Sequence, residues 1–339
     1  IFIADKLLQT GFQTKCESEP WNKNLQREYT TKNLKRKEMH ALKKKRERDW
    51  LPVTVLLLTV LLLVLCLVGF DHHEPDGPDG NGKAAESELS ADELQVTFFD
   101  VGKSDAILVE QSGYRMLIDT SFDDQADVLL DYFAERGIDT LDYLIITHFD
   151  KDHVGGADKI LESVSVARVI LPQYEKESKQ YAQFMEALEQ SAQTEREILP
   201  AGGEWSEEFG QTRLRVTAAE RTDYGADEEN DFSLATYLTY GETKFLFPGD
   251  AEDARQTELL HAGDIDCDVL KVPYHGRLVD ASAAFLTACS PKIAFIPDSD
   301  EEAASPMVVA ILKELGTDVH SGRDGDLVVV SDGKDVFVK

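Results

Sequence analysis

The residues of this chain that are best suited to chemistry lie in one short stretch, residues 147–156. His148, Asp150, Asp152 and His153 place two imidazoles and two carboxylates within six positions. Imidazole and carboxylate are ligands that zinc, manganese and iron accept. The alternative is a polar turn whose Asp residues cap the next helix, but capping accounts for only one Asp. We therefore interpret this stretch as a metal-ligand motif.

The flanking residues predict how this motif is held in place. Residues 141–146 form an apolar run that is typical of a buried strand. The pair Gly155-Gly156, followed by residues 157–161, indicates a turn into a helix. A loop that leaves a strand end in this way can aim several alternate side chains at one point.

Two further ligand-type side chains also follow predicted strands. Asp250 comes after the run 244–247 and Gly249, and His275 comes after the run 268–272. Each is weak evidence alone, because an Asp after Gly is usually a turn residue. Together with the first motif they supply a bridging carboxylate and a sixth ligand, which is what a two-metal hydrolytic site requires.

Strand and helix patterns alternate from residue 94 to the end of the chain, which predicts an α/β domain. Two successive sets of strands, with helices returning over each, predict two sheets packed face to face and covered by helices. The expected strands are 94–101, 106–109, 114–119, 141–146, 168–171, 213–216, 234–238, 244–247, 268–272, 292–296 and 326–330. The expected helices include 157–161, 174–192 and 253–262.

The N-terminal part of the chain differs from this domain in charge. Residues 1–50 carry 13 Lys and Arg against 7 Asp and Glu, residues 51–70 carry no charge, and the remainder has a formal charge of −35. The apolar run 51–70 has the length of a transmembrane helix, and its basic flank predicts a cytoplasmic N-terminus with residues beyond 70 outside the cell. A cleaved signal peptide is the alternative, but the run is long and lacks a following pattern of small residues.

The domain boundaries follow from these changes in composition. Residues 1–50 are expected to be a basic cytoplasmic tail, within which 1–38 precede the first Met and are interpreted as an over-extended start. Residues 51–70 are the expected signal-anchor, 71–93 a flexible extracytoplasmic linker, and 94–339 the outer domain. Cys267 and Cys289 each lie beside an apolar run, the usual position of a buried free thiol.

Several motifs of the outer domain resemble those of the metallo-β-lactamase superfamily. The residues that carry the resemblance are 99–108, 117–120, the His148–His153 motif, Gly249-Asp250 and His275-Gly276. Within that superfamily they are most similar to the hydrolase domain of ComEC-type DNA-uptake proteins and its free-standing relatives. The resemblance covers residues 94–339 and implies a four-layer αββα sandwich with metal ions at the sheet edges.

The resemblance also implies a role for each site residue. His148 and Asp150 would hold one metal, Asp152, His153 and His275 the other, and Asp250 would bridge the two. The supporting residues would be Asp100, Asp105 and Asp119. One or two zinc ions are the expected cofactor, with manganese as the alternative. The implied reaction is attack by a metal-bound hydroxide on a phosphodiester, with Asp152 as the catalytic residue that orients or deprotonates the water.

The chain departs from the family pattern at four positions. Ser104 and Ser121 stand where glycine is common, Tyr274 replaces the first His of the usual His-His-Gly, and Ser305 stands where many relatives carry His before Pro306. These departures keep a second hypothesis open, namely a catalytically weakened domain used for binding or scaffolding at the cell envelope.

The leading hypothesis is a membrane-anchored, extracytoplasmic, metal-dependent hydrolase. Its substrate would be an anionic phosphodiester such as DNA or a cell-wall polymer. The charge of the outer domain opposes nucleic-acid binding over most of its surface, because phosphate contacts ordinarily come from Lys and Arg. A positive patch around Lys103 and Arg277 would have to offset this repulsion locally.

Overall fold

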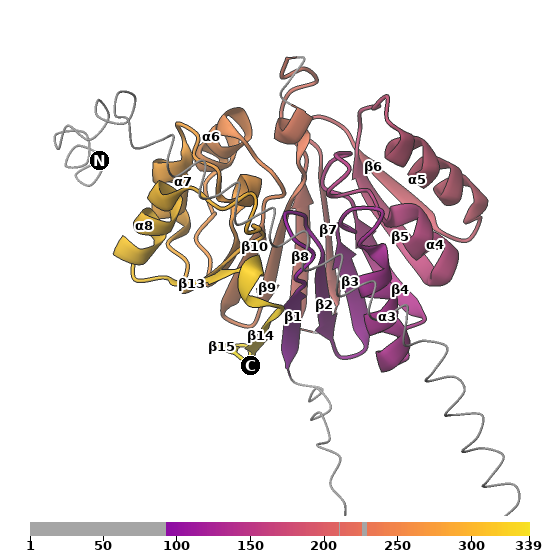
Figure 1. Ribbon diagram of the computed structural model, residues 1–339, viewed down its shortest axis with the longest axis horizontal. Helices are drawn as coiled ribbons and strands as arrows, with labels where there is room; N and C mark the ends of the chain where they lie inside the picture. The colour runs from indigo at the N-terminus through magenta and orange to yellow at the C-terminus, as the bar shows by residue number, and fades with distance from the viewer. Residues whose placement is uncertain (1–92, 210, 226–228) are drawn as a thin grey trace, which may run out of the picture. The chain divides into compact units, whose positions relative to one another are not determined.

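Two β-sheets stack face to face in the computed structural model, which describes residues 93–209, 211–225 and 229–339 (Figure 1). The predicted cytoplasmic tail, the apolar run 51–70 and the linker up to residue 92 lie outside the described residues. Among the residues that are described, none of the helices combines the length and the apolar character needed to span a membrane.

The first sheet has eight strands in the order β15-β14-β1-β2-β3-β4-β5-β6. The neighbouring strands from β15 to β3 in this order pair antiparallel, and those from β3 to β6 pair in parallel. Its strands are β1 (Leu94–Phe98), β2 (Ile107–Gln111), β3 (Tyr114–Ile118), β4 (Thr140–Ile145), β5 (Ser165–Pro172), β6 (Glu195–Leu199), β14 (Leu327–Ser331) and β15 (Val336–Val338).

The second sheet has seven strands in the order β13-β12-β11-β10-β9-β8-β7. Its strands β10 to β13 pair in parallel. Its strands are β7 (Glu204–Phe209), β8 (Thr212–Thr217), β9 (Ala235–Tyr240), β10 (Thr243–Phe247), β11 (Val269–Lys271), β12 (Ile293–Ile296) and β13 (Asp318–Ser321).

Helices cover the outer face of each sheet. The helices α3 (Ala126–Arg136), α4 (Ala157–Ser163) and α5 (Lys179–Gln190) pack on the first sheet, and α6 (Asp253–Ala262), α7 (Ser282–Cys289) and α8 (Pro306–Glu314) on the second (Figure 1). Short 3₁₀ turns lie at Glu229–Phe232, Pro273–Gly276 and Gly322–Asp324. The two-sheet α/β sandwich predicted from the sequence is confirmed.

The alternation of side chains along the strands produces these layers. Phe98 points into the core between the sheets, whereas its neighbour Phe99 belongs to the core beneath the helices of the first sheet. Successive side chains of a strand point to opposite faces, so neighbouring residues enter different layers of the core. In the central core the Phe98 ring stacks on Phe295 with ring centroids 4.8 Å apart.

The structure corrects two of the expected elements, the sheet to which one strand belongs and the residue at which one helix begins. The strand expected at 326–330 follows the second set in the chain, but β14 pairs with β1 and so belongs to the first sheet. The helix expected over 174–192 begins only at Lys179, because Ser178 caps it by accepting a hydrogen bond from the Tyr181 backbone nitrogen.

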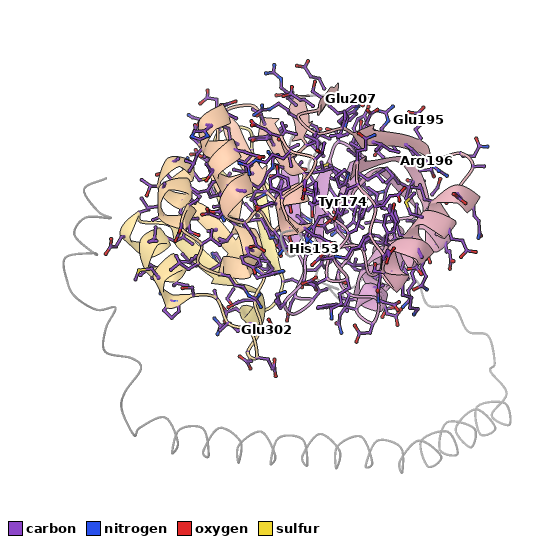
Figure 2. The ribbon with its side chains drawn as sticks, turned by 90° about the horizontal axis from the view of Figure 1, so that it is seen from above. His153, Tyr174, Glu195, Arg196, Glu207 and Glu302 are labelled. Carbon is purple, nitrogen blue, oxygen red and sulfur yellow. The ribbon has the colours of Figure 1, made fainter. Side chains whose placement is uncertain are left out.

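The side chains of the motifs gather where loops leave the strand ends. The loops after β4, β10 and β11 carry His153, Asp250 and His275, and the loop between β1 and β2 carries Asp105. Seen from above, His153 lies near the middle of the view, while Glu195, Glu207 and Glu302 lie toward its rim (Figure 2). The fold therefore draws loops from both sheets to one point.

Candidate metal centre

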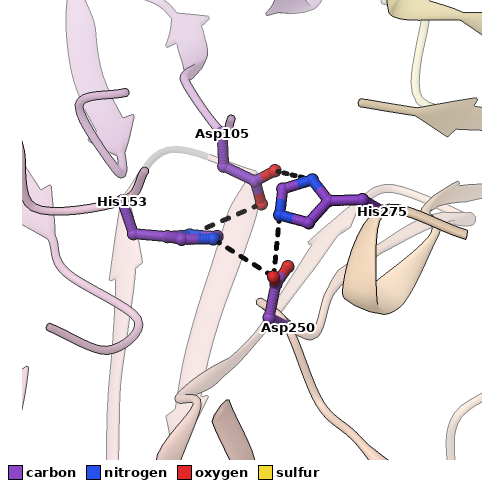
Figure 3. A group of neighbouring side chains, drawn as sticks. All are labelled: Asp105, His153, Asp250 and His275. Carbon is purple, nitrogen blue, oxygen red and sulfur yellow. Dashed lines mark ion pairs between the residues drawn. The ribbon is translucent and has the colours of Figure 1, made fainter. Parts of the chain in front are cut away.

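Four buried side chains form a group that could hold a metal ion. Asp105, His153, Asp250 and His275 each offer one ligand atom, and these atoms all lie within 4.8 Å of one another (Figure 3). Two imidazoles and two carboxylates are a ligand set that zinc, manganese or iron accepts.

The two imidazoles are oriented by hydrogen bonds on their far nitrogens. Nδ1 of His153 lies 2.7 Å from Asp119 Oδ2, and Nδ1 of His275 lies 2.9 Å from the backbone oxygen of Pro297. Both partners are acceptors, so each Nδ1 carries a proton and each Nε2 is left to face the group. This is the arrangement that orients histidine ligands in metal sites.

The atoms that face the centre lack other partners. Nε2 of His153, Nε2 of His275 and Oδ1 of Asp105 are buried and make no hydrogen bond. Nε2 of His275 lies 2.8 Å from Asp250 Oδ2, but in a direction that is not that of a hydrogen bond. Buried polar atoms are rarely left in this state. A divalent cation between them would satisfy all of them, so the residues present fit a metal ion.

The backbone that presents two of these side chains lies in the left-handed region. Gly249, just before Asp250, has a φ of +56°, and a Cβ there would come within 2.9 Å of Ser233 and Thr147. Tyr274 and His275 have φ values of 52° and 51°, which non-glycine residues rarely adopt. Strain of this kind gathers at functional sites, where the surrounding structure maintains it.

His148 lies beside this group without being part of it. Its ring centroid is 4.1 Å from that of His153, its Nδ1 lies 3.1 Å from Thr147 Oγ1, and its buried Nε2 has no hydrogen-bond partner. Burial, reinforced by the neighbouring His153, lowers the pKa of His148 to about 4. His148 is therefore neutral near pH 7.

Asp150 is not a member of the group and lies in an ion-pair cluster. Its Oδ1 lies 2.5 Å from Nζ of Lys176, which also pairs with Glu229. About a third of the Asp150 side chain is exposed. Neither Asp150 nor His148 is a member of the four-residue group, and their predicted role as ligands of one metal stays a prediction.

Asp152 lies at the edge of the centre. Its Oδ2 accepts a hydrogen bond from Lys103 Nζ at 2.8 Å and lies 3.5 Å from Nε2 of His275. Burial alone would raise the pKa of Asp152, but the neighbouring His275 and the charges of His153 and Lys103 hold it well below the usual range. Asp152 is therefore a carboxylate throughout the physiological range.

The three residues expected to support the site take different positions. Asp119 orients His153, and is itself held by the backbone nitrogen and the hydroxyl of Thr147 at 2.8 and 2.7 Å. Asp105 is a member of the four-residue group rather than a support for it. Asp100 is exposed and accepts a hydrogen bond from the Gly102 nitrogen, outside the group. The assignment of each ligand to a metal remains a prediction.

One residue of the centre was missed by the sequence analysis. Lys271 ends β11 with only 1% of its side chain exposed, and its Nζ lies 2.5 Å from Asp105 and 2.8 Å from Asp250. Burial lowers the pKa of Lys271, but the two carboxylates outweigh it and raise the pKa above the usual value. The sequence did contain an indication of this role, because Lys271 is a charged residue between the apolar residues Leu270 and Val272.

The substituted positions have local structural explanations. Ser121 adopts a φ of 59°, the conformation that glycine adopts most readily. Ser104 is buried and its hydroxyl donates to the Val101 oxygen at 2.7 Å. Ser305 caps α8 through the Met307 nitrogen, with Pro306 in the first turn, so this position serves the helix.

Comparison with known proteins identifies the family. The family model described as "Metallo-beta-lactamase superfamily" matches residues 99–297, more than half of the chain. The chain belongs to this superfamily.

Its curated relatives are ComEC-type competence proteins, as the sequence predicted. ComE operon protein 3 of Bacillus subtilis is 28% identical over 229 residues, covering 60% of this chain and 28% of that protein. Recombination protein 2 of Haemophilus influenzae is 28% identical over 214 residues, covering 62% and 25%. This chain therefore spans about a quarter of the length of these relatives. Among solved structures, the metallo-β-lactamase fold protein YhfI of Bacillus subtilis is 11% identical over 70% of this chain and 100% of its own, with a TM-score of 0.49.

Proposed function

We propose that residues 94–339 are a metal-dependent hydrolase that cleaves phosphodiester bonds on the outer side of a membrane, where residues 51–70 anchor it. The observation that carries the proposal is the convergence of Asp105, His153, Asp250 and His275, with ligand atoms that are buried and lack hydrogen bonds. A divalent ion held there would supply a Lewis acid that activates water near neutral pH and stabilises charge on the substrate.

Asp152 is placed to orient the attacking water. It lies at the edge of the centre, and its pKa below the usual range makes it a weak base. A carboxylate of this kind accepts a hydrogen bond well but takes up a proton poorly near neutral pH. Of the two roles considered for Asp152, the orientation of water is thus favoured over its deprotonation.

Two cations near Asp152 support a phosphate-containing substrate. Lys103 donates a hydrogen bond to Asp152 and keeps 17% of its side chain exposed. Arg277, whose charge acts on Lys103, is 48% exposed and pairs with Glu302 at the surface. Cations beside a metal centre offset the repulsion that the acidic surface exerts on a phosphate. We therefore propose that these two residues contact the non-bridging oxygens of the substrate.

The test uses the full-length chain, purified in mild detergent, stripped of metal and reconstituted with Zn²⁺ or Mn²⁺. Hydrolysis of bis-(p-nitrophenyl) phosphate is measured together with metal content per chain. The variant Asp250→Asn should lose both metal and activity, whereas Asp280→Asn, at an exposed position, should keep both. A wild-type chain that binds neither metal after reconstitution would contradict the proposal.

A binding or scaffolding role at the cell envelope is the second candidate. It is favoured by the ion pair of Asp150 with Lys176, which occupies one oxygen of a predicted ligand. In this case the wild-type chain would hold metal but hydrolyse no phosphodiester at any metal concentration tested. The same pair of measurements therefore separates the two functions.

A further inference from the structure

The buried ammonium group of Lys271 occupies a position between the two carboxylates of the centre. Its Nζ lies 2.5 Å from Asp105 Oδ2 and donates to Asp250 Oδ1 and to the Gly249 oxygen, each at 2.8 Å. An ammonium group has three hydrogens, and three acceptors surround it. Lys271 is thus a fixed internal cation with no remaining donor for a substrate.

In each of the two carboxylates, one oxygen contacts Lys271 and the other faces the metal position. Asp105 gives Oδ2 to Lys271, and its Oδ1 has no hydrogen-bond partner. Asp250 gives Oδ1 to Lys271, while its Oδ2 lies 2.8 Å from His275 Nε2 and 3.4 Å from His153 Nε2. One oxygen of each carboxylate therefore remains for a metal ion. A carboxylate that bridges two ions uses both of its oxygens, but Oδ1 of Asp250 is already bound to Lys271.

The charges around the centre also favour a single divalent ion. Four carboxylates (Asp105, Asp119, Asp152 and Asp250) face two ammonium groups (Lys103 and Lys271), which leaves a formal charge of −2 with neutral imidazoles. One divalent ion balances this charge. A second divalent ion would leave an excess of positive charge among buried groups, which is unfavourable in a medium of low polarity.

We propose that this centre holds one divalent ion, and that Lys271 permanently takes the place of a second one between Asp105 and Asp250. This inference rests on the proposed function and deepens it. Lys271 also acts as a positioning residue, because it fixes which carboxylate oxygens face the ion. His148, whose Nε2 is buried without a hydrogen bond, is the ligand that a second ion would recruit.

The experiment counts metal ions per chain. The full-length protein is stripped of metal, titrated with Mn²⁺, and measured by elemental mass spectrometry and by electron paramagnetic resonance. The wild type should saturate at one ion and show the spectrum of an isolated Mn²⁺. The variant Lys271→Met, which has nearly the same length but no charge, should bind two ions and show the spectrum of a coupled pair. Lys244→Met, which removes a partly exposed lysine paired with Asp266, should behave as the wild type.

The outcomes separate this inference from the function on which it rests. Two equally tight ions in the wild type would overturn the inference while leaving a metal-dependent hydrolase intact. One ion in both the wild type and a folded Lys271→Met variant would overturn the role of Lys271. No ion in the wild type would overturn the proposed function itself. Should circular dichroism show that Lys271→Met is unfolded, Lys271→Gln, which keeps a donor without the charge, replaces it.

Discussion

Oδ2 of Asp119 lies 2.7 Å from Nδ1 of His153, and both side chains are fully buried. Asp119 thereby fixes which nitrogen of His153 faces the metal position, and Thr147 in turn holds Asp119. This relationship connects the end of β3 to the loop after β4, since Asp119 directly follows the one strand and His153 lies in the other loop.

The variant Asp119→Asn should therefore weaken metal binding by roughly 10–100-fold, the usual effect of losing a partner behind a metal ligand. The asparagine keeps the size of the side chain but removes the charge that orients the imidazole. Dissociation constants for Zn²⁺ and Mn²⁺ are measured by competition with a chelator. Asp139→Asn, at an exposed position, is the matched control. Equal affinity in the two variants would show that Asp119 does not orient a ligand.

Metal affinity should rise with pH. Burial opposes the protonation of His153 and His275, but the charges of Asp250 and its neighbours outweigh burial and raise the pKa of both imidazoles above the ordinary value of 6.5. A metal ion must then displace a proton from each imidazole, so its affinity is lowest at acidic pH and increases until the pH passes the raised pKa values.

Calorimetry at pH 7 in two buffers of different ionisation enthalpy measures this proton release directly. His148 should contribute nothing to it, because its pKa of about 4 already leaves it neutral at that pH. Identical binding heats in the two buffers would show that the imidazoles are neutral before the metal binds.

Removing the charge of Asp152 should separate catalysis from metal binding. The variant Asp152→Asn should lower the hydrolysis of bis-(p-nitrophenyl) phosphate by about 10²–10⁴-fold, the range expected when a group that acts on the attacking water is lost. Its metal content should stay at the wild-type level, because Asp152 lies outside the four-residue group. Loss of metal in this variant would instead make Asp152 a ligand.

The buried guanidinium of Arg255 should be important for stability. Its Nε donates to the Ser233 oxygen and its Nη2 to the Thr217 oxygen, and its Nη1 pairs with Glu258. The variant Arg255→Met leaves the buried Glu258 with less compensation and should lower the free energy of unfolding by about 3–5 kcal/mol.

Urea denaturation followed by circular dichroism checks this prediction. The control Arg213→Met breaks an exposed pair with Glu208 and should change the free energy of unfolding by no more than about 1 kcal/mol. If the two variants had equal stability, the network around Arg255 would have no special role.

Much of the scaffold follows from local patterns in the sequence. The apolar run before His148 is a strand, the helix expected over 253–262 is α6 with the same bounds, and the two sets of strands form two sheets. Strand alternation and helix periodicity are properties of neighbouring residues, so they can be read without knowing the tertiary structure. The family motifs are also local, which is why the superfamily was identified from the residues alone.

Only the tertiary structure decided which side chains meet. Asp105 lies in a loop between two strands of the first sheet and Lys271 ends a strand of the second, far along the chain, yet their charged atoms are in contact. Asp150, only two positions from Asp152, turns instead toward Lys176. Spacing within a loop shows that a side chain is able to reach a metal ion, but the closest partner depends on how loops from both sheets approach one another. That approach is determined by the packing of the central core, and for this reason the sequence determined the ligand types while the fold selected among them.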